Sequence, residues 1–350
     1  MPKIRLFVVD DSPFFRAFLT QNIEKDPAIE IVGSFGDPVE ASKNIQALRP
    51  DVIALDMEMP RMRSDEFLRT VVPKFPNVKT IVISALSDNV FDALQAGAVD
   101  FVGKPGSSPG YDESEFIKDI IAKIKVASTA HTRRTSDLRA PRALPGEGSN
   151  RSQRPKITNA SLENIIAIGA STGGTEAILS VVKKFPANTP GIVVVQHMPP
   201  IFTKMYAERL NKNCAMNAVE ARNGDRVEPG TIYIAPGGDQ QLYVRRDSNG
   251  YYLHLNLEEK VSDHCPSVDV LFNSVAEVAD SNAVGVLLTG TSSDGASGLV
   301  NLKKTGAHTI GQNEETCVVY GMPKEAYNKG GIIEQLPLSA IGDAIIRRFG

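Results

Sequence analysis

The chain has 350 residues, a net charge of −3, 42% hydrophobic residues and no tryptophan. This length allows two domains, and a core with few aromatic residues is typical of α/β sheets filled by Val, Ile and Leu. The charge argues against general affinity for nucleic acid or for an anionic membrane surface. No apolar run reaches the roughly 18 residues of a membrane span, and the first residues lead into a predicted strand rather than a signal peptide. The scattered Cys214, Cys265 and Cys317 favour reduced thiols and a cytoplasmic location.

The first part of the chain, residues 1–127, alternates strand and helix patterns five times. Five βα units predict a parallel sheet with helices on both faces, so functional groups should gather at the carboxyl ends of the strands. The predicted strands are Ile4–Val9, Ile29–Gly33, Val52–Leu55, Thr80–Ile83 and Val99–Val102. The predicted helices cover residues 13–24, 38–48, 64–72, 88–96 and 112–127.

Polar residues follow four of these strands, namely Asp10, Asp11, Asp56, Ser84 and Lys104. Three neighbouring carboxylates need a cation, and their hard oxygen ligands suit Mg²⁺. A hydroxyl and an ammonium at the next strand ends could hold a phosphoryl group. One aspartate after a strand is more often a helix cap, but all five residues together predict a phosphoryl site.

Three stretches of this part resemble the receiver domain of two-component response regulators: Val8–Ser12, Ala54–Pro60 and Asp100–Pro105. The resemblance implies a flavodoxin-like fold and phosphorylation of Asp56 by a histidine kinase. In the same family a cis peptide often precedes the proline that corresponds to Pro105. One departure from the family pattern is Arg63-Ser64, where Asp-Gly is usual.

The resemblance also implies a role for each polar residue of the site. Asp10, Asp11 and Asp56 would bind Mg²⁺. Ser84 and Lys104 would contact the phosphoryl group, and the nearby Phe101 would be the aromatic residue that rotates on activation.

Residues 128–160 lose all periodicity and are rich in Pro, Gly, Ser and basic residues. This composition predicts a flexible basic linker between the first domain and a second domain at 161–350. A nucleic-acid contact is the alternative, but the segment has no interleaved aromatic residues and no helical register.

The second domain alternates strands and helices again, which predicts another doubly wound α/β domain with a β-hairpin insertion. The predicted strands begin at Ile165 and continue with Gly191–Gln196, Thr231–Ala235 and Ala283–Leu288. The hairpin pairs Gln241–Val244 with Tyr251–Leu255. Helices are predicted at about residues 175–184, 202–210, 267–279, 296–304 and 338–348.

Ser171 stands in a G-x-S-x-G turn between the strand at Ile165 and the following helix. Such a turn lifts a serine hydroxyl above a parallel sheet, with backbone N–H groups near Thr172 facing the site of a developing oxyanion. Two alternatives are a simple N-cap at Ser171 or Thr172 and a dinucleotide loop, which would need a glycine at position 171.

A serine nucleophile needs a base, and His197 directly follows the strand Gly191–Gln196. It therefore shares the carboxyl edge of the sheet with Ser171 and can titrate near neutral pH. His264 lies in a polar loop, where a capping or surface role is expected. His254 and His308 lie in strands and are better interpreted as packing or surface residues.

Asp294 follows the strand Ala283–Leu288 and its loop, so it is a third strand-end residue at this edge. It can orient His197, and its alternative role is the N-cap of the helix that follows. Ser171, His197 and Asp294 together predict a serine-hydrolase triad, in a chain order that differs from that of the α/β-hydrolases.

The second domain resembles the catalytic domain of the chemotaxis protein-glutamate methylesterases. The matching stretches are Ile168–Glu176, Gln196–Pro199, Ile234–Gly238, Pro266–Asp269 and Val319–Pro323. The resemblance implies phosphorylation-activated hydrolysis of glutamate γ-methyl esters on chemoreceptors, without a cofactor for hydrolysis or insertion into the membrane. It also implies glutaminase activity on receptor glutamines and a receiver domain that covers the active site.

Several departures support a rival hypothesis, a phospho-regulated binding module with a degenerate esterase domain. Thr291-Ser292-Ser293 replaces a Met-Gly-containing stretch, Asp239-Gln240 stands where the family commonly has a histidine after the Ala-Pro-Gly stretch, and Cys265 replaces an arginine. If Ser292 needed a positive φ, its Cβ would strain the backbone. A DNA-binding regulator is a weaker third hypothesis, because no basic face or helix-turn-helix pattern is present.

Overall fold

The computed structural model describes residues 2–59, 64–85, 89–106, 111–130 and 162–349. Contacts divide the chain into two compact units, residues 1–140 and 141–350. The predicted linker at 128–160 lies outside the described residues except at its start, where a helix runs on to Thr129, and its boundaries stay a prediction. Among the helices of the described ranges, none is long and apolar enough to cross a membrane.

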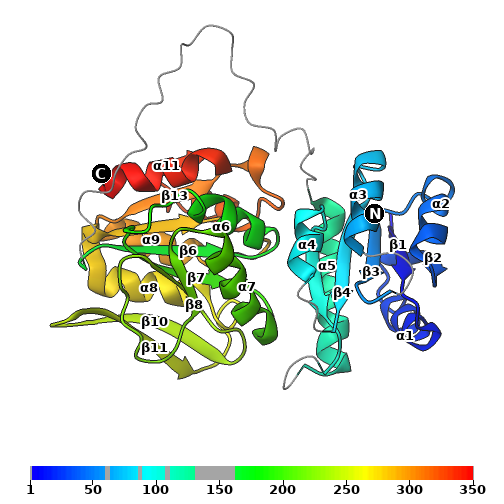
Figure 1. The fold of residues 1–350 in the computed structure, drawn as a ribbon, viewed down its shortest axis with the longest axis horizontal. Coiled ribbons are helices and arrows are strands. Elements are labelled where there is room, and N and C mark those ends of the chain that lie inside the picture. The colour runs from blue at the N-terminus through cyan, green and yellow to red at the C-terminus, as the bar shows by residue number, and fades with distance from the viewer. Residues whose placement is uncertain (1, 60–63, 86–88, 107–110, 131–161, 350) are drawn as a thin grey trace, which may run out of the picture. The chain divides into compact units, whose positions relative to one another are not determined.

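The first unit is a five-stranded parallel sheet with strand order β2-β1-β3-β4-β5, which confirms the flavodoxin-like prediction. Helices α1 and α5 pack together on one face, and α2, α3 and α4 on the other (Figure 1). The strands are β1 (Ile4–Val9), β2 (Ile29–Phe35), β3 (Val52–Asp56), β4 (Lys79–Ser84) and β5 (Asp100–Gly103). The helices are α1 (Pro13–Ile23), α2 (Pro38–Leu48), α3 (Ser64–Lys74), α4 (Val90–Gln95) and α5 (Glu113–Thr129).

Local sequence explains where the first helices begin. Ser12 accepts a hydrogen bond from the backbone N–H of Phe15 at 3.3 Å, and Pro13 occupies the first turn of α1. Asp37 and Pro38 repeat this arrangement at α2. A capping oxygen followed by proline starts a helix because one orphan N–H is satisfied and another is absent.

The second unit has a seven-stranded parallel sheet with strand order β14-β13-β12-β6-β7-β9-β8 and a separate antiparallel hairpin, β10-β11. The doubly wound prediction with a hairpin insertion is therefore confirmed. The strands of the sheet are β6 (Ile165–Ala170), β7 (Gly191–Gln196), β8 (Asn217–Glu220), β9 (Thr231–Ile234), β12 (Ala283–Leu287), β13 (His308–Gln312) and β14 (Glu334–Leu336). The hairpin consists of β10 (Gln240–Asp247) and β11 (Gly250–Leu257). The helices are α6 (Gly174–Val182), α7 (Pro200–Asn213), α8 (Val268–Ala279), α9 (Ala296–Lys304), α10 (Met322–Asn328) and α11 (Leu338–Phe349).

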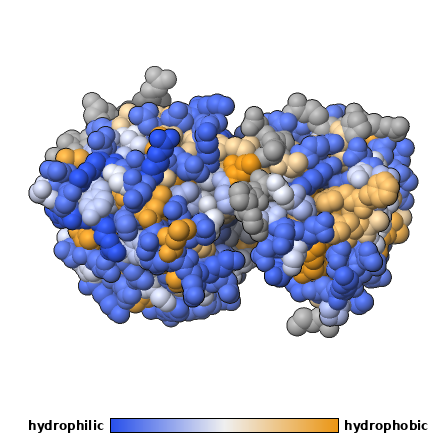
Figure 2. Space-filling model, turned by 90° about the horizontal axis from the view of Figure 1, so that it is seen from below, coloured by the Kyte–Doolittle hydropathy of each residue, from blue (hydrophilic) through white to orange (hydrophobic). Residues whose placement is uncertain are grey.

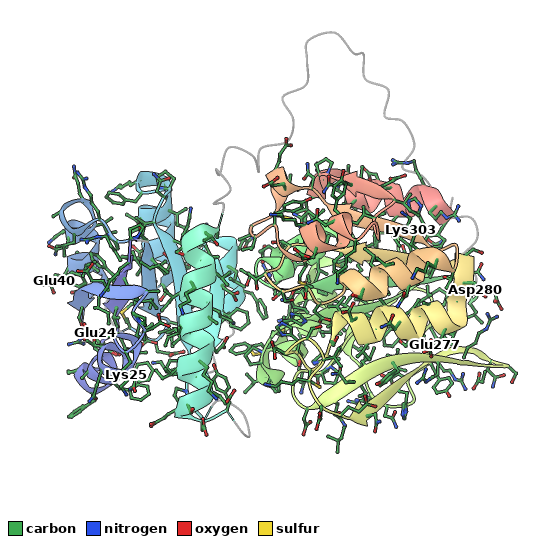
Figure 3. All side chains as sticks on the ribbon, turned by 180° about the vertical axis from the view of Figure 1, so that it is seen from behind. Glu24, Lys25, Glu40, Glu277, Asp280 and Lys303 are labelled. Atoms are coloured by element: carbon green, nitrogen blue, oxygen red, sulfur yellow. The ribbon has the colours of Figure 1, made fainter. Side chains whose placement is uncertain are left out.

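Helices cover both faces of the second sheet, with α6 contacting α7 and α11 on one face and α9 contacting α8 and α10 on the other. Figure 3, which labels Glu277 on α8 and Lys303 on α9, shows these two helices side by side. The hairpin adds Leu242 and Leu253 to the core that α8 builds with Leu271. The surface seen in Figure 2 is mainly hydrophilic, and its hydrophobic residues gather in patches, the broadest of which lies on the right of the view, on the first unit.

Strand β6 lies between β12 and β7, so the loops after these three strands leave the sheet at the same edge. All strands run parallel, but the side on which strands are added to the sheet reverses at β6. Strands β7 and β9 lie on one side of β6, and the later strands β12 and β13 lie on the other. Ligand sites of open α/β sheets form at such a reversal, beyond the carboxyl ends of the strands.

Candidate functional site

The structure brings the three predicted triad residues of the second unit to this reversal point. Ser171 follows β6 and donates its backbone N–H to the carbonyl of Thr289 at 3.0 Å. His197 follows β7, and its N–H bonds to the carbonyl of Ala170 at 3.1 Å. Asp294 ends the loop after β12 and is fully buried. Three neighbouring strand ends therefore supply a hydroxyl, an imidazole and a carboxylate.

The turn at Ser171 does not serve as a helix cap. The N-cap of α6 is Gly173, with φ of 75°, and no side chain caps this helix. The alternative interpretation, in which Ser171 or Thr172 is the N-cap, is therefore wrong, and Gly173 is needed because its φ lies in the left-handed region. Gly290 crosses close above the serine, since a Cβ on it would lie 2.8 Å from the Cβ of Ser171.

His197 and Asp294 form a direct pair. The Nε2 atom of His197 lies 2.9 Å from Oδ2 of Asp294, and both side chains are almost fully buried. This bond places the ring proton on Nε2, so Nδ1 carries the lone pair. Nδ1 is buried and hydrogen-bonds to no residue in the described ranges. The ring can therefore accept a proton through Nδ1 while Asp294 stabilises the resulting cation.

Asp294 is held as an anion by three further donors. Its carboxylate accepts bonds from the Ser267 hydroxyl at 2.7 Å and from the N–H groups of Val268 at 2.7 Å and Asp269 at 2.9 Å. Burial raises the pKa of Asp294, but the bonds from His197, Ser267 and Asp269 outweigh it and hold the pKa below its ordinary value. The carboxylate stays ionised at neutral pH.

The expected alternative role of Asp294, the N-cap of its own helix, is wrong. Gly295, with φ of 85°, is the N-cap of α9 and no side chain caps it. Asp294 instead binds the N-terminus of α8, where the helix dipole favours a negative charge.

His264 is a residue of this site that the sequence did not reveal. Its ring stacks on the ring of His197 with centroids 3.7 Å apart and an interplanar angle of 11°. A tight turn presents it, because Val261 and His264 exchange two backbone bonds of 2.9 Å around Ser262 and Asp263, both at positive φ. The expected surface or capping role is therefore wrong. Ser-Asp is not a common pair for such a turn, so the sequence offered little signal.

This stack predicts a pH dependence of folding. Burial above all, with the neighbouring His197, lowers the pKa of His264 from 6.5 to about 4. The unfolded chain then takes up a proton near pH 6.5 while the folded chain does not, so stability is full above pH 6.5 and falls as the pH drops towards 4. We expect His264→Phe, which keeps an aromatic ring, to reduce this loss in denaturant unfolding of the second unit. Equal losses in the two proteins between pH 7 and 4.5 would contradict the expectation.

The departures at residues 291–293 do not strain the backbone. Ser292 is absent from the residues with positive φ in the described part of the chain, and its hydroxyl accepts a 3.3 Å bond from the N–H of Asp294. The concern that a Cβ at Ser292 is incompatible with this loop is therefore removed.

Cys265 precedes a cis peptide to Pro266. Within the described ranges this is the one cis bond, so the Lys104–Pro105 bond is trans. Arg63 lies outside the described residues, so the departure at this position has no structural outcome.

The first unit carries a second polar cluster, at the carboxyl edge of its own sheet. Carboxylate oxygens of Asp10, Asp11 and Asp56 lie within 4.8 Å of one another. Asp10 and Asp56 are buried and Asp11 is exposed. Oδ2 of Asp10 is buried without a hydrogen-bond partner in the described ranges, which fits a position for a cation. The donor set consists of carboxylates, as Mg²⁺ prefers.

Lys104 and Glu58 complete this cluster. The ammonium of Lys104 lies 2.8 Å from Asp56 and 3.4 Å from Glu58. Ser84 donates its hydroxyl to Glu58 at 2.9 Å. Burial above all, together with Asp10 and Glu58, raises the pKa of Asp56 to about 7 although Lys104 opposes the shift. A cation beside Asp56 would favour its ionised, nucleophilic form.

Phe101, the expected switch residue, lies on β5 with its ring buried against Phe91, at a centroid distance of 6.3 Å. The ammonium of Lys123 sits 5.2 Å from the centre of the same ring. The aromatic side chain is therefore packed inward in this structure.

Comparisons with known proteins match both units. A family model described as "CheB methylesterase" matches residues 166–345, and one described as "Response regulator receiver domain" matches residues 6–110. A solved structure of the CheB methylesterase catalytic domain from Thermotoga maritima is 38% identical, with a TM-score of 0.51. The match covers 53% of this chain and 97% of the chain of the solved structure.

Full-length relatives agree with the family models. The chain is 48% identical to a protein-glutamate methylesterase/protein-glutamine glutaminase 2 of Syntrophomonas wolfei over 99% of this chain and 97% of the relative. It is 43% identical to a protein-glutamate methylesterase/protein-glutamine glutaminase of Agrobacterium fabrum over 98% of this chain and 96% of the relative. The chain therefore belongs to the CheB methylesterase family, in the form that carries an N-terminal response regulator receiver domain.

Proposed function

We propose that this chain hydrolyses the γ-methyl esters of glutamate residues on chemoreceptors, with Ser171 as nucleophile, His197 as base and Asp294 as the orienting acid. The observation that carries the proposal is the buried 2.9 Å pair of His197 and Asp294 at the strand end next to Ser171. A reduced, cytoplasmic setting is supported by the free thiols of all three cysteines.

The proposed reaction uses the three side chains in turn. Ser171 Oγ attacks the ester carbonyl as His197 Nδ1 takes its proton, and Asp294 stabilises the imidazolium. The backbone N–H of Thr172 donates to the oxyanion. His197 then protonates the departing methanol. Water attacks the acyl-serine by the same route and leaves a glutamate carboxylate.

The names of the relatives also include protein-glutamine glutaminase. Attack of Ser171 on a side-chain amide would form the same acyl-serine and release ammonia. We therefore include deamidation of receptor glutamines in the proposed function. It requires no further side chain.

We further propose that a histidine kinase phosphorylates Asp56 and so activates the esterase. Asp10, Asp11 and Asp56 would hold Mg²⁺, which supplies positive charge against the phosphoryl oxygens. Lys104 and Ser84 would contact the phosphoryl group, so Ser84 must exchange its bond to Glu58 for one to phosphate. Reorientation of Phe101 would report this change to the rest of the domain.

The proposal is tested by methanol release from methylated receptor membranes, with and without acetyl phosphate. If the chain is the proposed esterase, it should release methanol, and acetyl phosphate should raise the rate of release. The rival binding module has less support because Ser292 is not strained and the triad side chains are present. Wild-type protein that becomes phosphorylated but releases no methanol would favour the binding module.

Magnesium should be needed for activation and not for hydrolysis. In the described ranges, the clustered ligand oxygens suited to a metal are those of Asp10, Asp11 and Asp56, none of which belongs to the second unit. We expect EDTA to abolish the stimulation by acetyl phosphate and to leave basal methanol release unchanged. A loss of basal release, restored by Mg²⁺, would show that hydrolysis itself uses a metal.

A further inference from the structure

Gln196, the last residue of β7, joins the two loops that carry Ser171 and His197. Its side chain is buried, with 3% exposure. The amide Nε2 donates one hydrogen bond to the carbonyl of Ser171 at 2.8 Å and another to the carbonyl of His197 at 3.1 Å. One side-chain amide thus holds the peptide groups that directly follow both residues.

These bonds fix the direction of the oxyanion donor. In a trans peptide the carbonyl and the N–H point to opposite sides, so holding the carbonyl of Ser171 also aims the N–H of Thr172. The same carbonyl accepts the N–H of Gly174 at 2.7 Å, which leaves the peptide group little freedom to rotate. The bond to the carbonyl of His197 restrains the backbone that carries the imidazole.

The chemistry of the contacts determines the orientation of the amide. Both partners of Nε2 are carbonyl oxygens, so the opposite orientation would place Oε1 against two acceptors. Oε1 instead lies near Gly174, where a Cβ would come within 2.0 Å of it. It is buried and hydrogen-bonds to no residue in the described ranges.

We propose that Gln196 is a positioning residue of the hydrolase. It directs the N–H of Thr172 towards the oxyanion and fixes the loops of Ser171 and His197 relative to each other. This inference rests on the proposed function of the triad. It assigns no contact between Gln196 and the substrate, so the residue should affect kcat rather than KM.

The test compares three variants of the full chain in the presence of acetyl phosphate and Mg²⁺. Gln196→Met keeps the length and apolar volume of the side chain and removes both donors. Gln196→Glu replaces the amide by a carboxyl group, which repels the two carbonyls when ionised and can donate to only one of them when protonated. Ser274→Ala is the matched control, because Ser274 is also buried and also makes two backbone bonds, to Leu271 at 2.8 Å and from Val244 at 2.9 Å, about two helical turns along α8 from the residues that bind Asp294.

Two rates are measured for each protein: methanol release from methylated receptor membranes, and covalent labelling of Ser171 by a fluorophosphonate probe. Removing an oxyanion donor outright costs about 10²–10³ in rate, so misaiming it should cost about tenfold or more. We expect Gln196→Met to lower kcat and the labelling rate by that factor with KM within about twofold, and Gln196→Glu, which cannot donate to both carbonyls, to lower both rates as well. Ser274→Ala should match the wild type in both rates.

The outcomes separate this inference from the proposed function. If Gln196→Met labels and turns over within twofold of the wild type, or if Ser274→Ala loses as much rate as Gln196→Met, the positioning role is wrong. If the wild type labels normally but releases no methanol, the proposed function fails while the labelling rates still decide the role of Gln196. A wild type that does not label would overturn both.

Discussion

Ser171→Ala should reduce methanol release by about 10⁴-fold or more without destabilising the domain, because triad residues act as a unit and the loss of the nucleophile removes covalent catalysis. The Ser171 side chain makes no hydrogen bond within the described ranges, so its removal breaks no structural contact. His197→Ala should cost a similar factor. The measurements are kcat on methylated receptor membranes and the unfolding temperature.

The control for this prediction is Ser180→Ala, a serine of α6 that lies outside the triad. It should leave turnover unchanged. A Ser171→Ala protein that retains more than about one hundredth of wild-type turnover would contradict covalent catalysis by Ser171, since residual rates without the nucleophile are far lower in such enzymes.

Asp294→Asn should lose less activity than Ser171→Ala but should unfold at a lower temperature. All four partners of the carboxylate are donors, namely His197, Ser267, Val268 and Asp269. An asparagine amide must turn its NH₂ group towards two of them. In either orientation the amide loses one N–H bond at the start of α8, together with either the bond to His197 or the bond to Ser267, so both catalysis and stability should fall.

The sequence predicted most of the fold, because in a doubly wound sheet the buried strands are continuous aliphatic runs. These runs are easily distinguished from the helices, whose apolar residues recur every three or four positions. The elements it missed are short and polar or lie at the edge of the second sheet. Strand β8 reads Asn-Ala-Val-Glu, β14 has three residues and α10 has seven. The two strands depend on pairing with β9 and β13 rather than on local pattern, and α10 packs against α9 and β13.

Only the site residues that follow strands could be predicted from the sequence. Ser171, His197 and Asp294 each follow a strong strand, so topology alone brings them to one edge. The contacts of His264 and Ser267 could not be predicted in this way, because these residues do not follow strands of the sheet. His264 lies in a turn, and Ser267 lies at the start of a helix. Gln196 was hidden for another reason. It reads as the end of a buried strand, and only its two carbonyl partners reveal what its amide does.

Asp56→Asn should abolish the response of the esterase to acetyl phosphate and leave basal methanol release unchanged. In the proposed function the carboxylate of Asp56, which lies at the carboxyl end of β3 beside Lys104, accepts the phosphoryl group. The proposed mechanism of hydrolysis uses none of the residues in this cluster. The matched control is Asp51→Asn, an exposed residue just before the amino end of β3, which should respond like the wild type.

The sign of the coupling is tested by removing residues 1–150. If the unphosphorylated receiver domain inhibits the esterase, deletion should raise basal methanol release, and couplings between sites typically amount to about 5- to 150-fold. The same deletion should remove all response to acetyl phosphate. A truncated protein that is folded but no faster than the unphosphorylated full chain would instead mean that phosphorylation activates through a contact the receiver domain supplies. Inhibition predicts that Asp56→Asn stays at the low basal rate while the deletion exceeds it, and activation by contact predicts that both stay low.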